Sequence, residues 1–424
     1  LLTAGFAAIF IQEQDVVSDV SLTYGAIFLG LCFAGHMFLR FTLPYADPYI
    51  FPLVAVLACF GLVVIYRIDD ELAREQAQWF VVGLVLFAAT ILLLRDLRVL
   101  EQYRYTIAAL GLFLLFLPRV PGIGQQVNGA YLGVGVGPIS FQPAEFGKIA
   151  IIIFLAAYLQ DTRQVLVQGS RRFLGVTIPP LKHFGPLLVV WGAAMFMLVF
   201  IRDLGSSLMY FGGFLALLYV ATNRLSFVTI GLALFAIGAW FFASTVGHVQ
   251  ERVDVWRNPF NPEWVEREGY QIAQGLFAQA DGGLFGTGLG ASLLTGPGGE
   301  TLIPAPHTDL IYAVIANELG LVGVCGLLLV YMLLVERGFR TAMLAPDSFS
   351  KLLAAGLSAV FALQVFVIVG GVTKVIPLTG VTLPFVSYGG SSILANFVLV
   401  ALLLLVSDRA RRPRGGAMGR RGLR

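Results

Sequence analysis

Long apolar runs alternate with short polar segments along the whole chain. Within each run the apolar residues are continuous, and the runs approach the roughly 20 residues that a helix needs to cross a bilayer. Backbone groups in lipid must be bonded internally, so continuous runs predict transmembrane helices. We expect about twelve spans, at 1–11, 22–39, 48–66, 78–95, 105–118, 144–158, 184–201, 206–221, 226–245, 309–335, 351–372 and 389–407.

Composition supports the same class of protein. The chain has 424 residues, of which 58% are hydrophobic and 12% charged, and its mean hydropathy is +0.83. Soluble domains carry about 25% charged residues, so an ordinary soluble globule is excluded. We predict an all-α, polytopic integral membrane protein. The run at 1–11 resembles the end of a longer helix, because the chain begins without a methionine and without the basic segment of a signal peptide.

The three cysteines do not point to a metal site. Cys32, Cys59 and Cys325 each lie inside an apolar run, without CxxC or Cys/His metal-site spacing. We interpret them as small buried hydrophobic residues, and we predict no metal ligands from them.

Basic residues predict the orientation of the spans. With the C-terminus placed in the cytoplasm, 19 of the 28 Lys and Arg residues fall on the cytoplasmic face and 8 on the opposite face, while Lys148 lies inside a span. Cytoplasmic loops carry the excess of basic residues. We therefore expect three outer segments rich in Gly and Pro, at 119–143, 246–308 and 373–388. The basic tail at 409–424 is expected to lie against anionic lipid.

The stretch 303–312 closes the longest outer segment and opens an apolar helix. Two prolines precede the helix, and Thr308 or Asp309 can cap it. This places a carboxylate beside His307 at the depth where the membrane meets water. The structural interpretation is an N-cap aspartate, and the functional one is a reactive carboxylate at the outer surface.

Ionisable residues at two further span ends are candidates for the same site. Glu145 and Lys148 are three residues apart and share one helix face. They either neutralise each other or hold a cation ready for an anionic substrate group, since charges within spans are costly and often functional. Arg202 and Asp203 form a short outer turn, in which Asp203 either caps the next helix or joins that polar cluster.

The long outer loop supplies more candidates. Arg252 lies in an aromatic and basic stretch that predicts a helix on the membrane surface, and Tyr270 and Gln271 follow it. The glycines at 282–290 predict tight turns or a close backbone approach to a ligand. They lack the βαβ context of a nucleotide site, so we give that function no weight.

The last outer turn is also rich in Pro and Gly and contains Ser387 and Tyr388. Irregular backbone at membrane depth is tolerated only where it is buried in protein or lines a wet cavity. A purely structural re-entrant turn is the alternative for this segment.

Five motifs together resemble the SEDS family, which includes RodA, FtsW and SpoVE. They read FQPAEFGKIA, RDLGSS, NP…GYQ…GG…GTGLG, PAPHTDLIYA…NELGLVG and IPLTGVTLPFVSYGGSS. The last two are highly specific, and the resemblance runs from about Asp47 to Arg412. The layout and the wording GGVTKVIPLTG are most similar to actinobacterial RodA-like members. Since the family core has ten spans, the resemblance implies two extra helices in 1–47, a core at 48–408 and a cytoplasmic tail at 409–424.

The resemblance implies a peptidoglycan glycosyltransferase of the bacterial plasma membrane that polymerises lipid II during elongation or division, with its active site on the extracytoplasmic side. Such a reaction turns an α-linked sugar into a β-1,4 link, and it needs a base on the acceptor hydroxyl and charge stabilisation on the leaving pyrophosphate. Asp309 matches the family's catalytic carboxylate. We predict that substrate is bound by Lys148, Glu145, Asp203, Arg202, His307, Arg252, Tyr270, Gln271, Ser387 and Tyr388.

The resemblance also implies partners. A class B penicillin-binding protein, a single-span transpeptidase, is expected beside lipid II and membrane lipid, and no nucleic acid is expected. We predict no resident cofactor, while a divalent cation beside the lysine, or in its place, stays open.

The chain departs from the family pattern at three places. Ser140 stands where many members have Arg, Ala305 where a Glu is usual, and 129–132 reads GAYL instead of the usual GA-x-R-W run. These departures put the substrate contacts of the first outer loop in question, but not the assignment of Asp309.

Two rival functions remain open at this point. A lipid II flippase or other transporter needs ionisable groups at mid-membrane and two access states, whereas the charges here cluster at the outer ends of spans. A non-catalytic scaffold for a transpeptidase predicts that Asp309→Asn preserves activity. Polymerisation of lipid II by purified protein separates both from the enzyme.

Overall fold

The computed structural model describes residues 19–413 apart from 95, 128–129, 137–138, 169–170, 174–175, 179–191, 193–202 and 293–301. The predicted span at 1–11, the span at 184–201 except for residue 192, and Arg202 lie outside the described residues.

The described part of the chain is mainly helical, which confirms the predicted all-α class. Among the described residues, nine helices are long and apolar enough to cross a membrane. They are α2 (Asp19–Thr42), α3 (Ile50–Ile68), α4 (Asp70–Leu93), α7 (Pro143–Gln168), α9 (Leu204–Thr222), α10 (Leu225–Thr245), α13 (Ile311–Leu344), α14 (Ser348–Val372) and α15 (Gly390–Arg411). The shorter helices are α5 (Arg98–Gln102), α6 (Arg104–Phe116), η1 (Leu117–Arg119), α11 (Gly247–Arg257) and α12 (Tyr270–Gly282).

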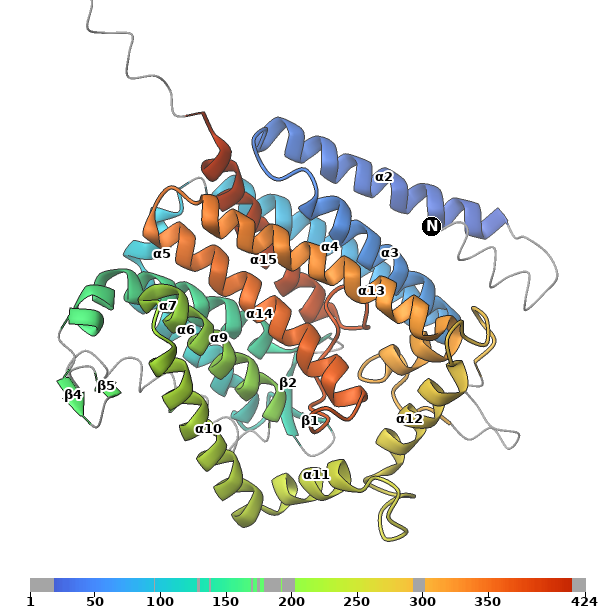
Figure 1. The fold of residues 1–424 in the computed structure, drawn as a ribbon. Helices are drawn as coiled ribbons and strands as arrows, with labels where there is room; N and C mark the ends of the chain where they lie inside the picture. Colours follow the sequence, from blue (N-terminus) through green and yellow to red (C-terminus); the bar gives the residue numbers. More distant parts are fainter. Residues whose placement is uncertain are drawn as a thin grey trace, which may run out of the picture.

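Helices α7, α14 and α15 form the buried centre of the bundle, and their apolar segments are about four-fifths buried. Helix α4 packs along α15, α3 packs against α4 and α13, and α9 packs against α7 and α14. Helix α2 lies along the outside of α3 and α4, and α10 stands at the opposite side (Figure 1). Both helices expose apolar side chains, such as Phe33 and Trp240, as helices in contact with lipid do.

Some helices are longer than their apolar runs predict. Helix α4 begins at Asp70 rather than at 78, because the Asp69 carboxylate caps it by accepting from the backbone N–H groups of Glu71 and Leu72. The first two turns are polar and therefore invisible to hydropathy. The predicted helix around Arg252 is present as α11.

Short strands were not predicted. Strands β1 (Gly124–Val127), β2 (Ala130–Val136) and β3 (Ile139–Phe141) form an antiparallel sheet in the first outer segment. Strands β4 (Arg171–Phe173) and β5 (Val176–Ile178) pair as a hairpin between two spans. The chain leaves β3 directly into α7, so the sheet fixes where α7 begins.

The glycine series at 282–290 packs against a break in α13. Gly320 interrupts that helix with φ of 64° and ψ of −168°. A Cβ at Gly286 would lie 2.1 Å from the carbonyl oxygen of Glu318, and one at Gly282 would lie 2.0 Å from that of Ala316. These glycines thus permit a close backbone approach to α13, whereas the predicted approach to a ligand stays a prediction.

Candidate active site

The predicted site residues gather where the N-terminal ends of α7, α9, α13 and α15 meet. Asp203 lies one residue before α9, Asp309 lies two residues before α13, and Glu145 is in the first turn of α7. Helix α11 and the connection between α14 and α15 close this end of the bundle (Figure 1).

The segment 303–310 is held by the connection between α14 and α15. The backbone N–H of Tyr388 donates to the His307 carbonyl at 2.8 Å, and the Ser387 hydroxyl donates to the Thr308 carbonyl at 2.8 Å. The Ser387 hydroxyl also accepts from the Leu383 backbone N–H at 2.9 Å, and this side chain is buried. Its hydroxyl is thus engaged in fixing the residue next to Asp309.

Backbone strain accompanies this docking. Ala305 and Phe385, neither of them glycine, have φ of 46° and 64°, in the left-handed region. Gly380, with φ of 73°, lies against Asp309: a Cβ built on Gly380 would be 3.6 Å from Asp309 Oδ2. Left-handed conformations of residues other than glycine persist only where surrounding contacts hold them. Here the hydrogen bonds between the segment 303–310 and the connection from α14 to α15 supply such contacts.

Asp309 does not cap the helix that follows it. The N-cap position of α13 is Leu310, whose side chain makes no cap hydrogen bond. The predicted capping by Thr308 or Asp309 is therefore wrong, because the helix starts one residue later than a cap at Asp309 requires. Burial raises the pKa of Asp309 to about 6, and the nearby Arg252 guanidinium opposes that rise.

Arg252 interacts electrostatically with two carboxylates, those of Asp203 and Asp309. It projects from α11, and its Nη1 donates to the Leu378 carbonyl at 2.9 Å. Its charge favours the ionised forms of both Asp203 and Asp309, while burial lowers its own pKa. An arginine stays charged at neutral pH. Arg252 therefore supplies the positive charge that acts on the Asp309 carboxylate.

Asp203 fulfils both interpretations made from the sequence. Its carboxylate caps α9 by accepting from the Ser206 backbone N–H at 2.9 Å. It is buried, which raises its pKa, while the bonds to Ser206 and the charge of Arg252 lower it. The Glu145 charge also raises the pKa of Asp203. Asp203 therefore caps α9 and also belongs to the polar cluster that contains Glu145.

Glu145 and Lys148 form a buried ion pair. Lys148 Nζ lies 2.6 Å from Glu145 Oε2 and donates to Gln364 Oε1 at 2.6 Å. Gln364 in turn donates to the Thr382 carbonyl at 3.0 Å, which connects the pair to the segment before Ser387. Lys148 is only 1% exposed, so its charge is enclosed by this network.

A pocket opens beside these groups. It runs between the starts of α7 and α9 and the chain around Gly380, which adjoins Asp309. Its lining residues are Gln142, Ala144, Glu145, Asp203, Ser206, Met209, Gly380, Val381 and Thr382. Two carboxylates and backbone groups thus border a space next to the candidate base.

Tyr388 and His307 lie on the other flank of Asp309. Their rings pack edge to face with centroids 5.8 Å apart, and the Tyr388 hydroxyl donates to the Glu75 carboxylate. Burial and Glu75 raise the pKa of Tyr388, and burial lowers that of His307. His307 is therefore neutral near pH 7.

Tyr270 and Gln271 open α12, which packs against α13. In the same helix Gly275 lies against Leu310, and a Cβ built on Gly275 would be 3.2 Å from that side chain. Within the described part of the chain, no three His, Cys, Asp or Glu side chains are grouped so that they could hold a metal ion.

Two glutamines were missed by sequence reasoning. Gln364 lies inside α14 and joins Lys148 to the Thr382 carbonyl. Gln76 of α4 donates to the Ser387 carbonyl at 3.1 Å and accepts from the Gly389 N–H at 3.1 Å. An amide in an otherwise apolar run signals a polar partner, so Gln364 was detectable from the sequence.

These features define a polytopic α-helical membrane protein with a cluster of acidic and basic groups at one end of its bundle. The chain belongs to the FtsW/RodA/SpoVE family of cell cycle proteins, whose sequence model matches residues 48–412. The resemblance inferred from the motifs is thereby confirmed.

Individual relatives agree with this assignment. The peptidoglycan glycosyltransferase RodA of Mycobacterium tuberculosis is 42% identical over 96% of this chain and 88% of its own length. This chain is also similar to a chain in a solved structure of a peptidoglycan synthase complex, which describes the coordination of polymerization and crosslinking. The two are 27% identical, with a TM-score of 0.68 over 87% of this chain and 99% of that one. The rod shape determining protein RodA of Thermus thermophilus is 28% identical, with a TM-score of 0.60 over 87% of this chain and 98% of its own.

Proposed function

We propose that this protein is a peptidoglycan glycosyltransferase that polymerises lipid II, with Asp309 as the general base. Its family and relatives support this activity. The observation that carries the role of Asp309 is a half-buried carboxylate that caps no helix and whose pKa is raised to about 6. A base is most effective when its pKa lies near the working pH.

In the proposed reaction, the hydroxyl of the acceptor sugar attacks the anomeric carbon of the donor. Asp309 takes the hydroxyl proton as the new carbon–oxygen bond forms. The bond from the anomeric carbon to the pyrophosphate breaks, and the lipid pyrophosphate leaves with its electron pair. Attack opposite the leaving group converts the α-link into the β-1,4 link. Arg252 and Lys148 are the cations proposed to offset the charge that develops on the pyrophosphate.

The experiment that tests the function uses purified protein and fluorescent lipid II, with products separated on a gel. A ladder of glycan strands supports a polymerase. Lipid II that stays unmodified while crossing vesicle membranes would favour a flippase instead. Absence of any polymer, with the transpeptidase partner both present and absent, would favour a scaffold.

The pH dependence of this activity follows from the pKa of Asp309. Because the carboxylate must be ionised to accept a proton, the rate is expected to rise with pH and to level off above about pH 6. Below that pH the rate should fall about tenfold per pH unit. Initial rates of lipid II consumption between about pH 4.5 and 8 measure this profile. A rate that stays constant down to about pH 4 would contradict a base with a raised pKa.

We further propose that the site faces the outside of the cell and the C-terminus faces the cytoplasm, which the distribution of basic residues supports. In a variant without the three native cysteines, Glu266→Cys should react with an impermeant maleimide on intact cells, and Pro346→Cys only after lysis. Both positions are exposed. The connection between α11 and α12, which contains Glu266, and that between α13 and α14, which contains Pro346, lie at opposite ends of the bundle (Figure 1). The reverse pattern of labelling would invert the orientation.

The partner proposed for this enzyme is a single-span class B transpeptidase. The similarity to a chain from a peptidoglycan synthase complex supports a partner of this kind. For this reason the polymerisation assay is run with and without such a protein.

A further inference from the structure

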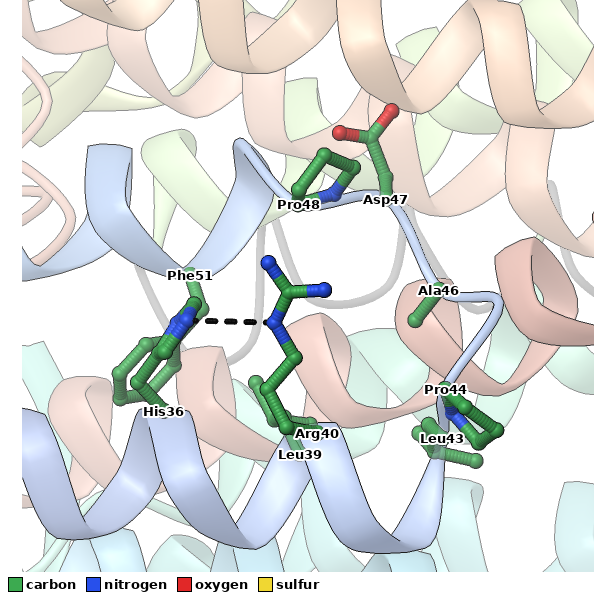
Figure 2. Close-up of a pocket in the computed structure, with 9 residues that line it drawn as sticks. All are labelled: His36, Leu39, Arg40, Leu43, Pro44, Ala46, Asp47, Pro48 and Phe51. Atoms are coloured by element: carbon green, nitrogen blue, oxygen red, sulfur yellow. Dashed lines mark hydrogen bonds between the residues drawn. The ribbon is translucent and has the colours of Figure 1, made fainter.

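A pocket lies at the end of the bundle opposite the candidate active site, between the last turns of α2 and the start of α3. Figure 2 shows its lining residues, which are His36, Leu39, Arg40, Leu43, Pro44, Ala46, Asp47, Pro48 and Phe51. Most of this lining precedes residue 48, where the family match begins. The pocket is therefore built largely from residues that the family model does not cover.

Arg40 provides the charge of this pocket. Its guanidinium extends from α2 toward the start of α3, and Nε points to His36 Nε2 at 3.4 Å (Figure 2). The side chain is exposed, and no carboxylate of the described residues forms an ion pair with it. The two Nη groups of Arg40 are thus available to an external anion.

Asp47 is the acid of the pocket lining, but it does not neutralise Arg40. Its carboxylate points away from the Arg40 guanidinium (Figure 2) and is fully buried. There it accepts from Arg337 Nε at 2.9 Å, from Arg411 and from the Tyr49 backbone N–H at 2.9 Å. One carboxylate therefore serves two arginines, so Asp47 is engaged elsewhere and leaves the Arg40 charge uncompensated.

The rest of the lining suits a lipid. Leu39, Leu43 and Phe51 are buried apolar side chains next to Arg40, which lies in the last turn of α2, where a spanning helix meets the headgroup layer. Basic pockets between transmembrane helices bind acidic headgroups, and a guanidinium matches a phosphate in geometry. We propose that this pocket binds the headgroup of an anionic phospholipid, with its phosphate on Arg40 at the mouth of the pocket and its acyl chains in the surrounding bilayer.

Such a lipid would bridge α2 to the core. Among the described elements, helix α2 makes its main contacts with α3 and α4, and few of its residues are buried. A lipid headgroup held by Arg40 at the start of α3 adds a contact between α2 and the part of the bundle that the family model covers.

Native mass spectrometry of the purified full chain tests this site without requiring enzymatic activity. The delipidated protein is mixed with phosphatidylglycerol or phosphatidylcholine, and the bound fraction is measured for the parent, Arg40→Gln, Arg40→Lys and Arg98→Gln. Arg98 is a matched control, since it is an exposed arginine at the same end of the bundle but outside the pocket. Melting temperatures of all variants check the fold.

The parent is expected to retain phosphatidylglycerol in preference to phosphatidylcholine. Arg40→Gln should lose about fivefold in phosphatidylglycerol affinity, while Arg40→Lys and Arg98→Gln keep most of it. Equal retention of the two lipids by the parent, or an equal loss in Arg98→Gln, would overturn the proposal. Displacement of bound phosphatidylglycerol by millimolar inorganic phosphate would show a soluble-anion site and would overturn its assignment to a lipid.

Discussion

Asp309→Asn is expected to abolish glycan polymerisation in a protein that still folds, inserts into membranes and binds lipid II. Loss of a general base costs typically 10²–10⁴-fold in rate, which corresponds to roughly 3 to 5 kcal/mol of barrier. Asparagine keeps the size and the hydrogen-bonding ability of the side chain but cannot take the proton. The measurement is polymer yield from fluorescent lipid II, beside lipid II binding by the same preparation.

Stability should respond in the opposite direction. The pKa of Asp309 is raised in the folded protein, so the ionised carboxylate costs folding free energy once the pH exceeds the unfolded value. Asparagine removes that cost. Because no cap bond is lost, the melting temperature at neutral pH should stay the same or rise slightly.

The control for this experiment is Asp281→Asn. Asp281 is an exposed acid in the last turn of α12, so its replacement should leave polymer yield unchanged. A yield from Asp309→Asn close to that of the parent would remove Asp309 from the catalytic role. The buried carboxylates of Asp203 and Glu145 would then be the next bases to test.

The sequence predicted the helices well because each span is a local property. Apolar runs located every long helix in the described residues, and errors arose where polar caps extended a helix, as at Asp69 of α4. The sheet β1–β3 was missed because its strands are short and rich in glycine, and because its pairing is a contact between segments rather than a property of one.

The site was predictable residue by residue but not as an arrangement. Motifs singled out Asp309, Asp203 and Glu145, each at the start of its own helix. What brings them together is the docking of Ser387 and Tyr388 onto 303–310, a contact across about 80 residues that no local pattern encodes. The placement of Arg252 depends in the same way on its bond to the Leu378 carbonyl.

Lys148→Ala is expected both to destabilise the protein and to abolish polymerisation. The lysine is 1% exposed and pairs with Glu145 at 2.6 Å, so its removal leaves a buried carboxylate without its partner. Breaking a buried pair in this way costs roughly 3 to 5 kcal/mol. Melting temperature and polymer yield of the purified variant measure the two effects.

A double variant separates fold from function at this position. Lys148→Met with Glu145→Gln removes both charges, and replacing a buried pair by neutral groups is often close to neutral for stability. We expect its melting temperature to return toward that of the parent while polymerisation stays absent, because no cation remains there for the pyrophosphate. Recovery of both stability and polymer yield would show that the ion pair only holds the helices together. Charge stabilisation of the leaving group would then rest on Arg252, which interacts electrostatically with Asp309.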